Sequence, residues 1–313
     1  MSNGGKSSEY MRLLRSEALG RISRLELIAR GMVSGFITGR HTSPYKGASV
    51  EFAEHRSYVP GDDIRDLDWR VFGKSDRYYV KQYIEETNLR ATVLVDASAS
   101  MKYTGDVAAK IDGQPVSKFE YARYLAAALT YLLINQQDAV GLVTYDTELR
   151  KYIPPRSSAR HLRAILQELD ASEPGGETTL APVFHDIAER IHRRGLVIII
   201  SDLFDDEQEI IKALHHFRYR NHEVLVLHVM ADEELTFPFN RFSDFRDLEH
   251  LIPNAELDPL SIKSAYLEQV RHFVQTLEEA CGQMEIDYVP MNTKTPFEIS
   301  LSSFLAARQR QKR

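Results

Sequence analysis

Apolar residues follow two alternating patterns from residue 91 to the end of the chain. Short apolar segments of strand length alternate with longer segments in which apolar residues recur every three or four positions. The most apolar short segments are ATVLVD, GLVIIISD and HEVLVLHVM, and the clearest helical segment is SKFEYARYLAAALTYLL. Continuous apolar strands separated by helices are typical of a mainly parallel sheet covered on both faces. The pattern therefore predicts an α/β fold.

Local signals place several of the predicted elements. Ser117 is followed three residues later by Glu120, which is a capping box at the start of a helix. Asp258 and Pro259 open a helix predicted over 259–281, and a second capping box opens a last helix near Thr295. Further helices are expected over 158–170, over 180–194 and through DEQEIIKALHHF, and further strands at DAVGLVTYD, ELRKYI and MEIDYVP.

The first 90 residues differ from the rest. Between Glu9 and Met32 apolar residues recur at helical spacing with arginines on the other face, which predicts an amphipathic helix within 1–34. Residues 35–90 are rich in aromatic, charged and turn residues, which favours short strands in a small β-rich extension. The α/β domain is then expected over 91–313.

Composition and charge exclude several classes of protein. Lys and Arg number 39 against 45 Asp and Glu, a net charge of −6 that argues against general nucleic-acid binding. No stretch has the ~20 apolar residues of a membrane span, the start lacks the apolar centre of a signal peptide, and Cys281 is the single cysteine. We therefore expect a cytoplasmic protein. The basic residues within 1–50 fit solvated helix faces or a weak contact with an acidic partner or anionic lipid.

Polar residues cluster where the predicted strands end. Asp96, Ser98 and Ser100 follow the first apolar strand, Thr178 and Thr179 precede a helix, and Asp202 closes the strand VIIISD. In a parallel sheet, ligands bind beyond the carboxyl ends of the strands. Carboxylate and hydroxyl oxygens suit a hard divalent cation such as Mg²⁺, so these residues predict a metal site.

Other functions remain open on these residues. Asp96 at a strand end could be the nucleophile of a metal-dependent phosphatase, but Ser98 stands where such enzymes place a second aspartate as general acid. DASAS lacks the glycines of a serine hydrolase elbow. A structural scaffold with an empty site is a third possibility. We favour a non-enzymatic module, because the site has hydroxyls and no general base beside them.

DASAS, the threonine of GGETTL and the aspartate of IIISD together resemble the metal-ion-dependent adhesion site (MIDAS) of von Willebrand factor A domains. The resemblance implies a Rossmann-like fold and a cation whose open position accepts an acidic residue from a partner protein. It makes Ser98, Ser100 and Thr178 direct ligands of Mg²⁺ (or Mn²⁺ or Ca²⁺), with Asp96 and Asp202 acting through water. Thr179 is the alternative to Thr178.

Longer stretches resemble the domain-of-unknown-function family 58. They are SPYKGASVEFAEHRSYVPGDDIRDLDWRVFGKSDRYYVKQYIEE, QQDAVGLVTYD and PFEISLSSFLAAR. That family implies a bacterial protein with a von Willebrand A-like domain, working with a MoxR-type AAA+ ATPase as an adaptor or assembly factor. This chain departs from many members in having no membrane span before the first stretch, and in a longer loop over 102–116.

A dense mixed-charge cluster lies within the extension. An ion-pair network is favoured over a second, nuclease-like metal site because arginines are interleaved with the acids, and Trp69 is expected to be a packing anchor. The cluster comprises Glu54, Arg56, Asp62, Asp63, Arg65, Asp68 and Arg70.

Overall fold

A computed structural model describes most of the chain from residue 49 onward. The described residues are 49–58, 67–75, 77–86, 89–111, 113–176, 180–240, 243–245, 255–297, 299–301 and 303. The predicted amphipathic helix within 1–34 lies outside these residues. The chain divides between Leu89 and Arg90 into two compact units, which are described separately.

The smaller unit contains a two-stranded antiparallel sheet and a short helix. Strand β1 (Ser49–Ser57) pairs with β2 (Tyr79–Glu86), with a bulge between Phe52 and Glu54. Helix α2 (Trp69–Ser75) corrects the expectation of strands at this point. It forms because the Asp68 carboxylate accepts hydrogen bonds from the backbone N–H groups of Arg70 (2.9 Å) and Val71 (3.3 Å), which caps the helix.

Two expectations for this unit have different outcomes. Trp69 is 58% exposed, so its expected role as a packing anchor is wrong; its ring contacts Phe72 edge-on. Of the acidic residues expected in the ion-pair network, Asp68 has a described side chain, and it caps helix α2. The side chains of its other acidic members, and of Arg56 and Arg65, lie outside the described structure.

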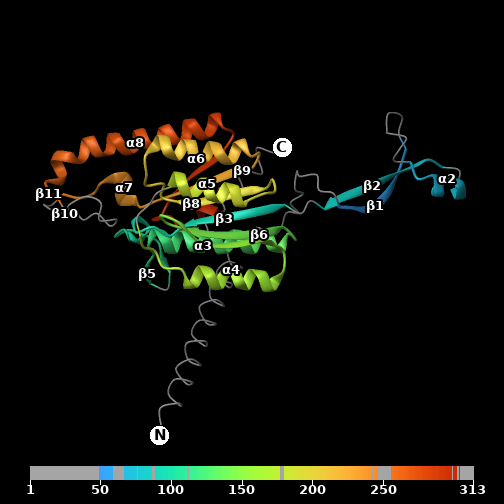
Figure 1. Cartoon of the computed structure of the whole chain (residues 1–313), viewed down its shortest axis with the longest axis horizontal. Helices are drawn as coiled ribbons and strands as arrows, with labels where there is room; N and C mark the ends of the chain where they lie inside the picture. Colours follow the sequence, from blue (N-terminus) through green and yellow to red (C-terminus); the bar gives the residue numbers. More distant parts are fainter. Residues whose placement is uncertain are drawn as a thin grey trace, which may run out of the picture. The chain divides into compact units, whose positions relative to one another are not determined.

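The larger unit is built on a six-stranded sheet with the order β12-β9-β8-β3-β6-β7 (Figure 1). Every neighbouring pair is parallel except β6 with β7, which is antiparallel. Numbered along the chain from β3, this is the doubly wound order 3-2-1-4-5-6 of Rossmann-like sheets. The expected fold class, an α/β fold with a mainly parallel sheet, is confirmed. The strands are β3 (Arg90–Asp96), β6 (Ala139–Tyr145), β7 (Leu149–Arg156), β8 (Leu196–Ser201), β9 (Glu223–Met230) and β12 (Asp287–Asn292).

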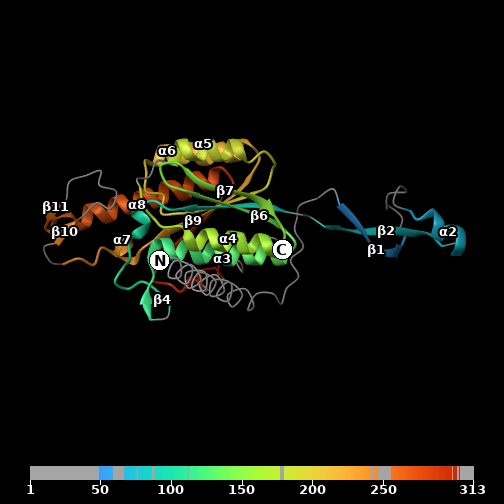
Figure 2. The ribbon, with the colours of Figure 1, turned by 60° about the horizontal axis from the view of Figure 1, so that its bottom comes forward.

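Helices cover both faces of this sheet. Helices α3 (Lys118–Asn135) and α4 (Ala159–Ala171) lie on one face, and α5 (Leu180–Arg190), α6 (Glu207–Tyr219) and α8 (Pro259–Gln283) lie on the other (Figures 1 and 2). The capping box of α3 is present as predicted, whereas α5 ends four residues before the predicted 194. Among the described residues, no helix is both long and apolar enough to span a bilayer.

Short elements complete the unit. They are the 3₁₀ helix η2 (Ser100–Lys102), helix α7 (Asp232–Thr236), and the paired strands β4 (Lys110–Ile111) with β5 (Gln114–Pro115) and β10 (Ser243–Phe245) with β11 (Ala255–Leu257).

The centre of the sheet explains where a site can form. β3 and β8 are neighbours, and their side chains are almost entirely buried. The chain leaves β3 toward α3 on one face and leaves β8 toward α6 on the other (Figure 1). The connections diverge between these two strands, so a crevice is expected beyond their carboxyl ends.

Candidate cation site

The structure places four of the five predicted metal ligands at this switch point. Asp96 is the last residue of β3, Ser98 and Ser100 follow it, and Asp202 comes directly after β8. Thr178 and the alternative Thr179 lie outside the described residues.

A tight turn after β3 orients the two serines. The Asp96 Oδ1 atom accepts a hydrogen bond from the Ser98 backbone N–H at 2.9 Å. This bond to the residue two positions on is the Asx-turn geometry that aspartate favours after a strand. It leaves the Ser98 and Ser100 hydroxyl oxygens 3.0 Å apart, with both side chains buried. The alternation of polar and small residues in DASAS therefore brings two hydroxyls to one point.

The second carboxylate oxygen of Asp96 is also occupied. The Ser201 hydroxyl donates to Asp96 Oδ2 at 2.5 Å, and its oxygen accepts from the Leu203 backbone N–H at 2.8 Å. Asp96 is fully buried. Ser201, the last residue of β8, thus ties the ends of the two central strands together. Sequence reasoning missed this role, although a hydroxyl ending the most apolar strand was visible in IIISD.

Burial and charge both act on Asp96. Burial, and after it the negative charge of Asp202, raise the pKa of its carboxyl to about 7. The hydrogen bonds from Ser201 and Ser98 act in the opposite direction. Two carboxylates in a buried place favour any positive charge that can reach them.

A buried lysine supplies one such charge. The Lys118 ammonium donates to Asp202 Oδ2 at 2.6 Å and to Glu234 Oε1 at 2.7 Å. Burial alone would lower the pKa of Lys118, but the charges of Asp202 and Glu234 outweigh it and hold the pKa above its usual value. Lys118 is the first residue of α3, where the helix dipole disfavours a cation. A lysine at this unfavourable position indicates that acidic side chains lie near it in the fold. The sequence analysis did not use this signal.

Backbone hydrogen bonds hold the loop after α4 against the DASAS turn. The Gly175 N–H donates to Ala97 O at 2.8 Å, and the Ala99 N–H donates to Gly176 O at 2.9 Å. The Arg150 guanidinium donates to Gly175 O at 2.6 Å and pairs with Asp146. The chain that leads to Thr178 is therefore anchored beside Ser98 and Ser100.

The described residues fit a small, hard cation. The donors are carboxylate and hydroxyl oxygens, and adjacent ligands of an octahedral Mg²⁺ at about 2.1 Å from the ion lie about 3.0 Å apart. The Ser98 and Ser100 hydroxyls have this spacing. Within the described parts of the chain, no group of three or more His, Cys, Asp and Glu side chains could hold a metal ion. Cation binding here would therefore depend on the serine hydroxyls.

These features define a class: a doubly wound α/β protein with an oxygen-rich site at the switch point of its sheet. The chain belongs to the family described as "Protein of unknown function DUF58", which matches residues 54–261. It is 28% identical over 218 residues to the uncharacterized proteins Rv1480 of Mycobacterium tuberculosis and Mb1516 of Mycobacterium bovis. Each match covers 68% of this chain and 65% of the relative, so the chain matches slightly under two thirds of the relatives' length.

Solved structures show more distant likenesses. BatB from Bacteroides thetaiotaomicron is 17% identical with a TM-score of 0.44, covering 70% of this chain and 99% of that one. The SpRpn10 VWA domain is 12% identical with a TM-score of 0.41, covering 69% and 95%. At these identities and TM-scores, no function passes from either protein to this chain.

Proposed function

We propose that the chain is a non-enzymatic, cation-dependent protein-interaction module. Mg²⁺, or Mn²⁺ or Ca²⁺ in its place, is held by Ser98, Ser100 and Thr178, with Asp96 and Asp202 behind bound waters. Its open position accepts a carboxylate from a partner protein. The observation that carries the proposal is the pair of buried hydroxyls 3.0 Å apart beside two strand-end carboxylates.

The state of Asp96 supports binding over catalysis. A phosphatase nucleophile needs a carboxylate oxygen that can reach its substrate. Both oxygens of Asp96 accept hydrogen bonds from the protein, and the side chain is fully buried. Neutral hydroxyl ligands leave a bound cation with most of its charge, which favours attraction of an outside carboxylate.

The partner class comes from the family resemblance. We propose that the chain acts with a MoxR-type AAA+ ATPase as an adaptor or assembly factor, in the cytoplasm. The long segment 97–116 after β3 includes η2 and the β4–β5 pair, and it carries both serine ligands near its start. This segment is suited to contact whatever protein supplies the carboxylate.

Calorimetric titration of Mg²⁺ into the metal-stripped full chain tests the cation site. Ser98→Ala removes a hydroxyl that lies 3.0 Å from the Ser100 hydroxyl and keeps the backbone N–H that donates to Asp96, so the fold is expected to survive. We expect Mg²⁺ affinity to fall about tenfold or more. Ser157→Ala removes an exposed serine after β7 and serves as the matched control. Equal Mg²⁺ affinity in wild type and Ser98→Ala would overturn the site.

A co-purification experiment tests the interaction separately. Wild type and Ser98→Ala are used as bait with the cognate MoxR-type ATPase, in Mg²⁺ and in EDTA. Cutting a desolvated charge contact costs about 2–5 kcal/mol, so the complex should weaken strongly without the cation. A complex that persists unchanged in EDTA would refute the cation-dependent mechanism.

A further inference from the structure

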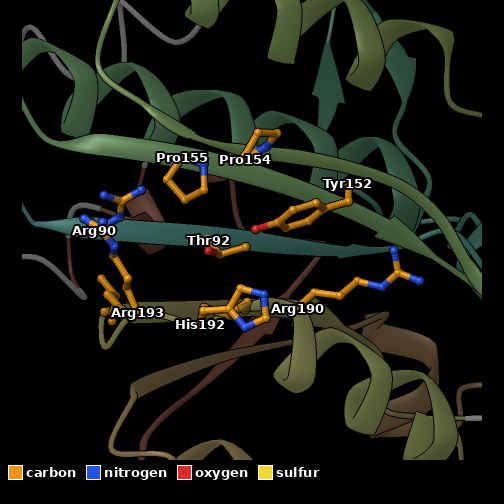
Figure 3. Close-up of a pocket in the computed structure, with 11 residues that line it drawn as sticks. Arg90, Thr92, Tyr152, Pro154, Pro155, Arg190, His192 and Arg193 are labelled. Atoms are coloured by element: carbon orange, nitrogen blue, oxygen red, sulfur yellow. The ribbon is translucent and has the colours of Figure 1, made fainter.

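A cavity lies at the end of the central strands opposite to the candidate cation site. It has a volume of about 180 Å³ and opens where β3 begins and where α5 leads into β8 (Figure 3). β3 runs from Arg90 at this cavity to Asp96 at the cation site. With a rise of about 3.3 Å per residue, the two places are about 20 Å apart. The cavity is therefore separate from the cation site.

Cationic side chains surround this cavity. Arg90, Arg190 and Arg193 line it together with His192, and none of its described lining residues is a carboxylate (Figure 3). Arg190 is paired with Asp186 on its own helix at 3.1 Å. Neither Arg90 nor Arg193 forms an ion pair with another described residue. As far as the described part of the chain shows, these two guanidinium groups remain available to an anion.

Neutral donors and apolar walls complete the lining. Thr92 and Tyr152 contribute hydroxyls, and Figure 3 shows the Tyr152 ring reaching toward Thr92 between the strands. Pro154 and Pro155 of β7 form one wall. Pro155 lies close to Gly141 of β6 because Gly141 has no side chain: a Cβ there would be 2.7 Å from Ile153 O and 3.0 Å from the Pro155 ring. Backbone packing between β6 and β7 therefore fixes the shape of this wall of the cavity.

We propose that this cavity binds a phosphate group, either as the free ion or as part of a small phosphate ester. Arginine offers planar, paired donors that match phosphate oxygens, and hydroxyls supply further hydrogen bonds. One water molecule occupies about 30 Å³ of liquid, so the cavity has the space of about six waters. That space admits a phosphate with a few further atoms.

Titration of inorganic phosphate and of glycerol 3-phosphate into the full chain at low salt, followed by calorimetry, tests this proposal. Arg193→Glu is expected to weaken binding about tenfold or more, because it replaces a donor by a repelling charge. Arg194→Glu is the matched control, since Arg194 is exposed, adjacent and outside the cavity lining. Both variants change the net charge equally.

The outcomes separate specific from general attraction. Phosphate binding that is lost in Arg193→Glu and retained in Arg194→Glu supports the site. The single variants Arg90→Gln and Thr92→Val should also bind phosphate more weakly than wild type. Tighter binding of the ester identifies a small phosphorylated molecule as the ligand source; tighter binding of the ion identifies free phosphate. No binding by wild type at millimolar phosphate, or equal losses in the two glutamate variants, overturns the proposal. Melting curves without phosphate verify that each variant is folded.

Discussion

The Lys118 ammonium lies 2.6 Å from the Asp202 carboxylate, and both side chains are only 3% exposed. Lys118 begins α3 and Asp202 follows β8, so the contact joins elements 84 residues apart. A positive charge from the protein itself therefore already sits beside one of the two carboxylates of the candidate cation site. Lys118 and a divalent ion are therefore expected to share the negative charge of Asp202.

Lys118→Met should destabilise the metal-free chain and increase its response to Mg²⁺. Removing one partner of a buried ion pair leaves an uncompensated charge, which costs about 3–5 kcal/mol. Mg²⁺ would then restore the missing positive charge. We expect a lower melting temperature without metal, and a larger rise on adding Mg²⁺ than in wild type. Thermal unfolding with and without Mg²⁺ measures both effects.

Two variants control this experiment. Lys212→Met removes an exposed lysine paired with Glu209 on α6 and should change neither quantity appreciably. Lys118→Met combined with Asp202→Asn removes both charges and should recover much of the lost stability. An Mg²⁺ response of Lys118→Met equal to that of wild type would count against a shared charge environment.

Gly176→Ala should destabilise the loop that leads to Thr178. Gly176 has a φ of +79°, which glycine adopts readily, and a Cβ there would be 2.6 Å from Asp146 Oδ2. The expected loss in the free energy of unfolding is about 1–3 kcal/mol. Denaturant unfolding measures it, and Mg²⁺ titration should show weaker binding. Gly175→Ala is the paired control, because its Cβ would meet no atom closer than 3.8 Å.

His222 should make the protein less stable in mild acid. Burial lowers the pKa of His222 below its usual 6.5. Below about pH 6.5 the unfolded chain therefore binds more protons at His222 than the folded chain does. Protonation then favours the unfolded chain, so the free energy of unfolding falls as the pH falls below this value. The free energy of unfolding of His222→Gln should vary less between pH 7 and pH 5 than that of wild type. Equal slopes in a urea series would contradict this.

Cys281 should react with iodoacetamide only when the chain unfolds. The thiol is fully buried in α8, and burial raises its pKa to about 12, so almost no thiolate exists at pH 8. Since the chain has one cysteine, mass spectrometry of the labelled protein gives a single signal. Rapid native labelling would show that α8 opens locally. Labelling should rise in parallel with denaturant unfolding.

Much of the larger unit could be predicted from the sequence because its four central strands are buried on both faces. Runs such as GLVIIISD leave little choice of structure, and the Ser117–Glu120 box marks the start of α3 through bonds between near neighbours. Helix α2 was missed because its only local signal, the Asp68 cap, lies inside a charged stretch without apolar periodicity.

The candidate site was predictable only in part, for a physical reason. Asp96 and Ser98 bond within one turn, so their arrangement follows from the local sequence. Ser201 reaches Asp96 across 105 residues, and Lys118 reaches Glu234 across 116. Such pairs depend on which strands and helices become neighbours. A lysine at the start of a helix and a serine at the end of an apolar strand are therefore useful signals to examine in similar sequences.

Both outer strands of the large sheet contain proline. Pro154 and Pro155 lie in β7, and Pro290 lies in β12 at the opposite edge. Proline has no N–H to donate, so neither edge offers an unbroken ladder to a strand from another molecule. Sheet-to-sheet polymerisation is discouraged on both sides, and a partner peptide that adds itself as a seventh strand is disfavoured. Under the proposed function, the partner protein is therefore expected to contact the loops and side chains at the ends of the strands.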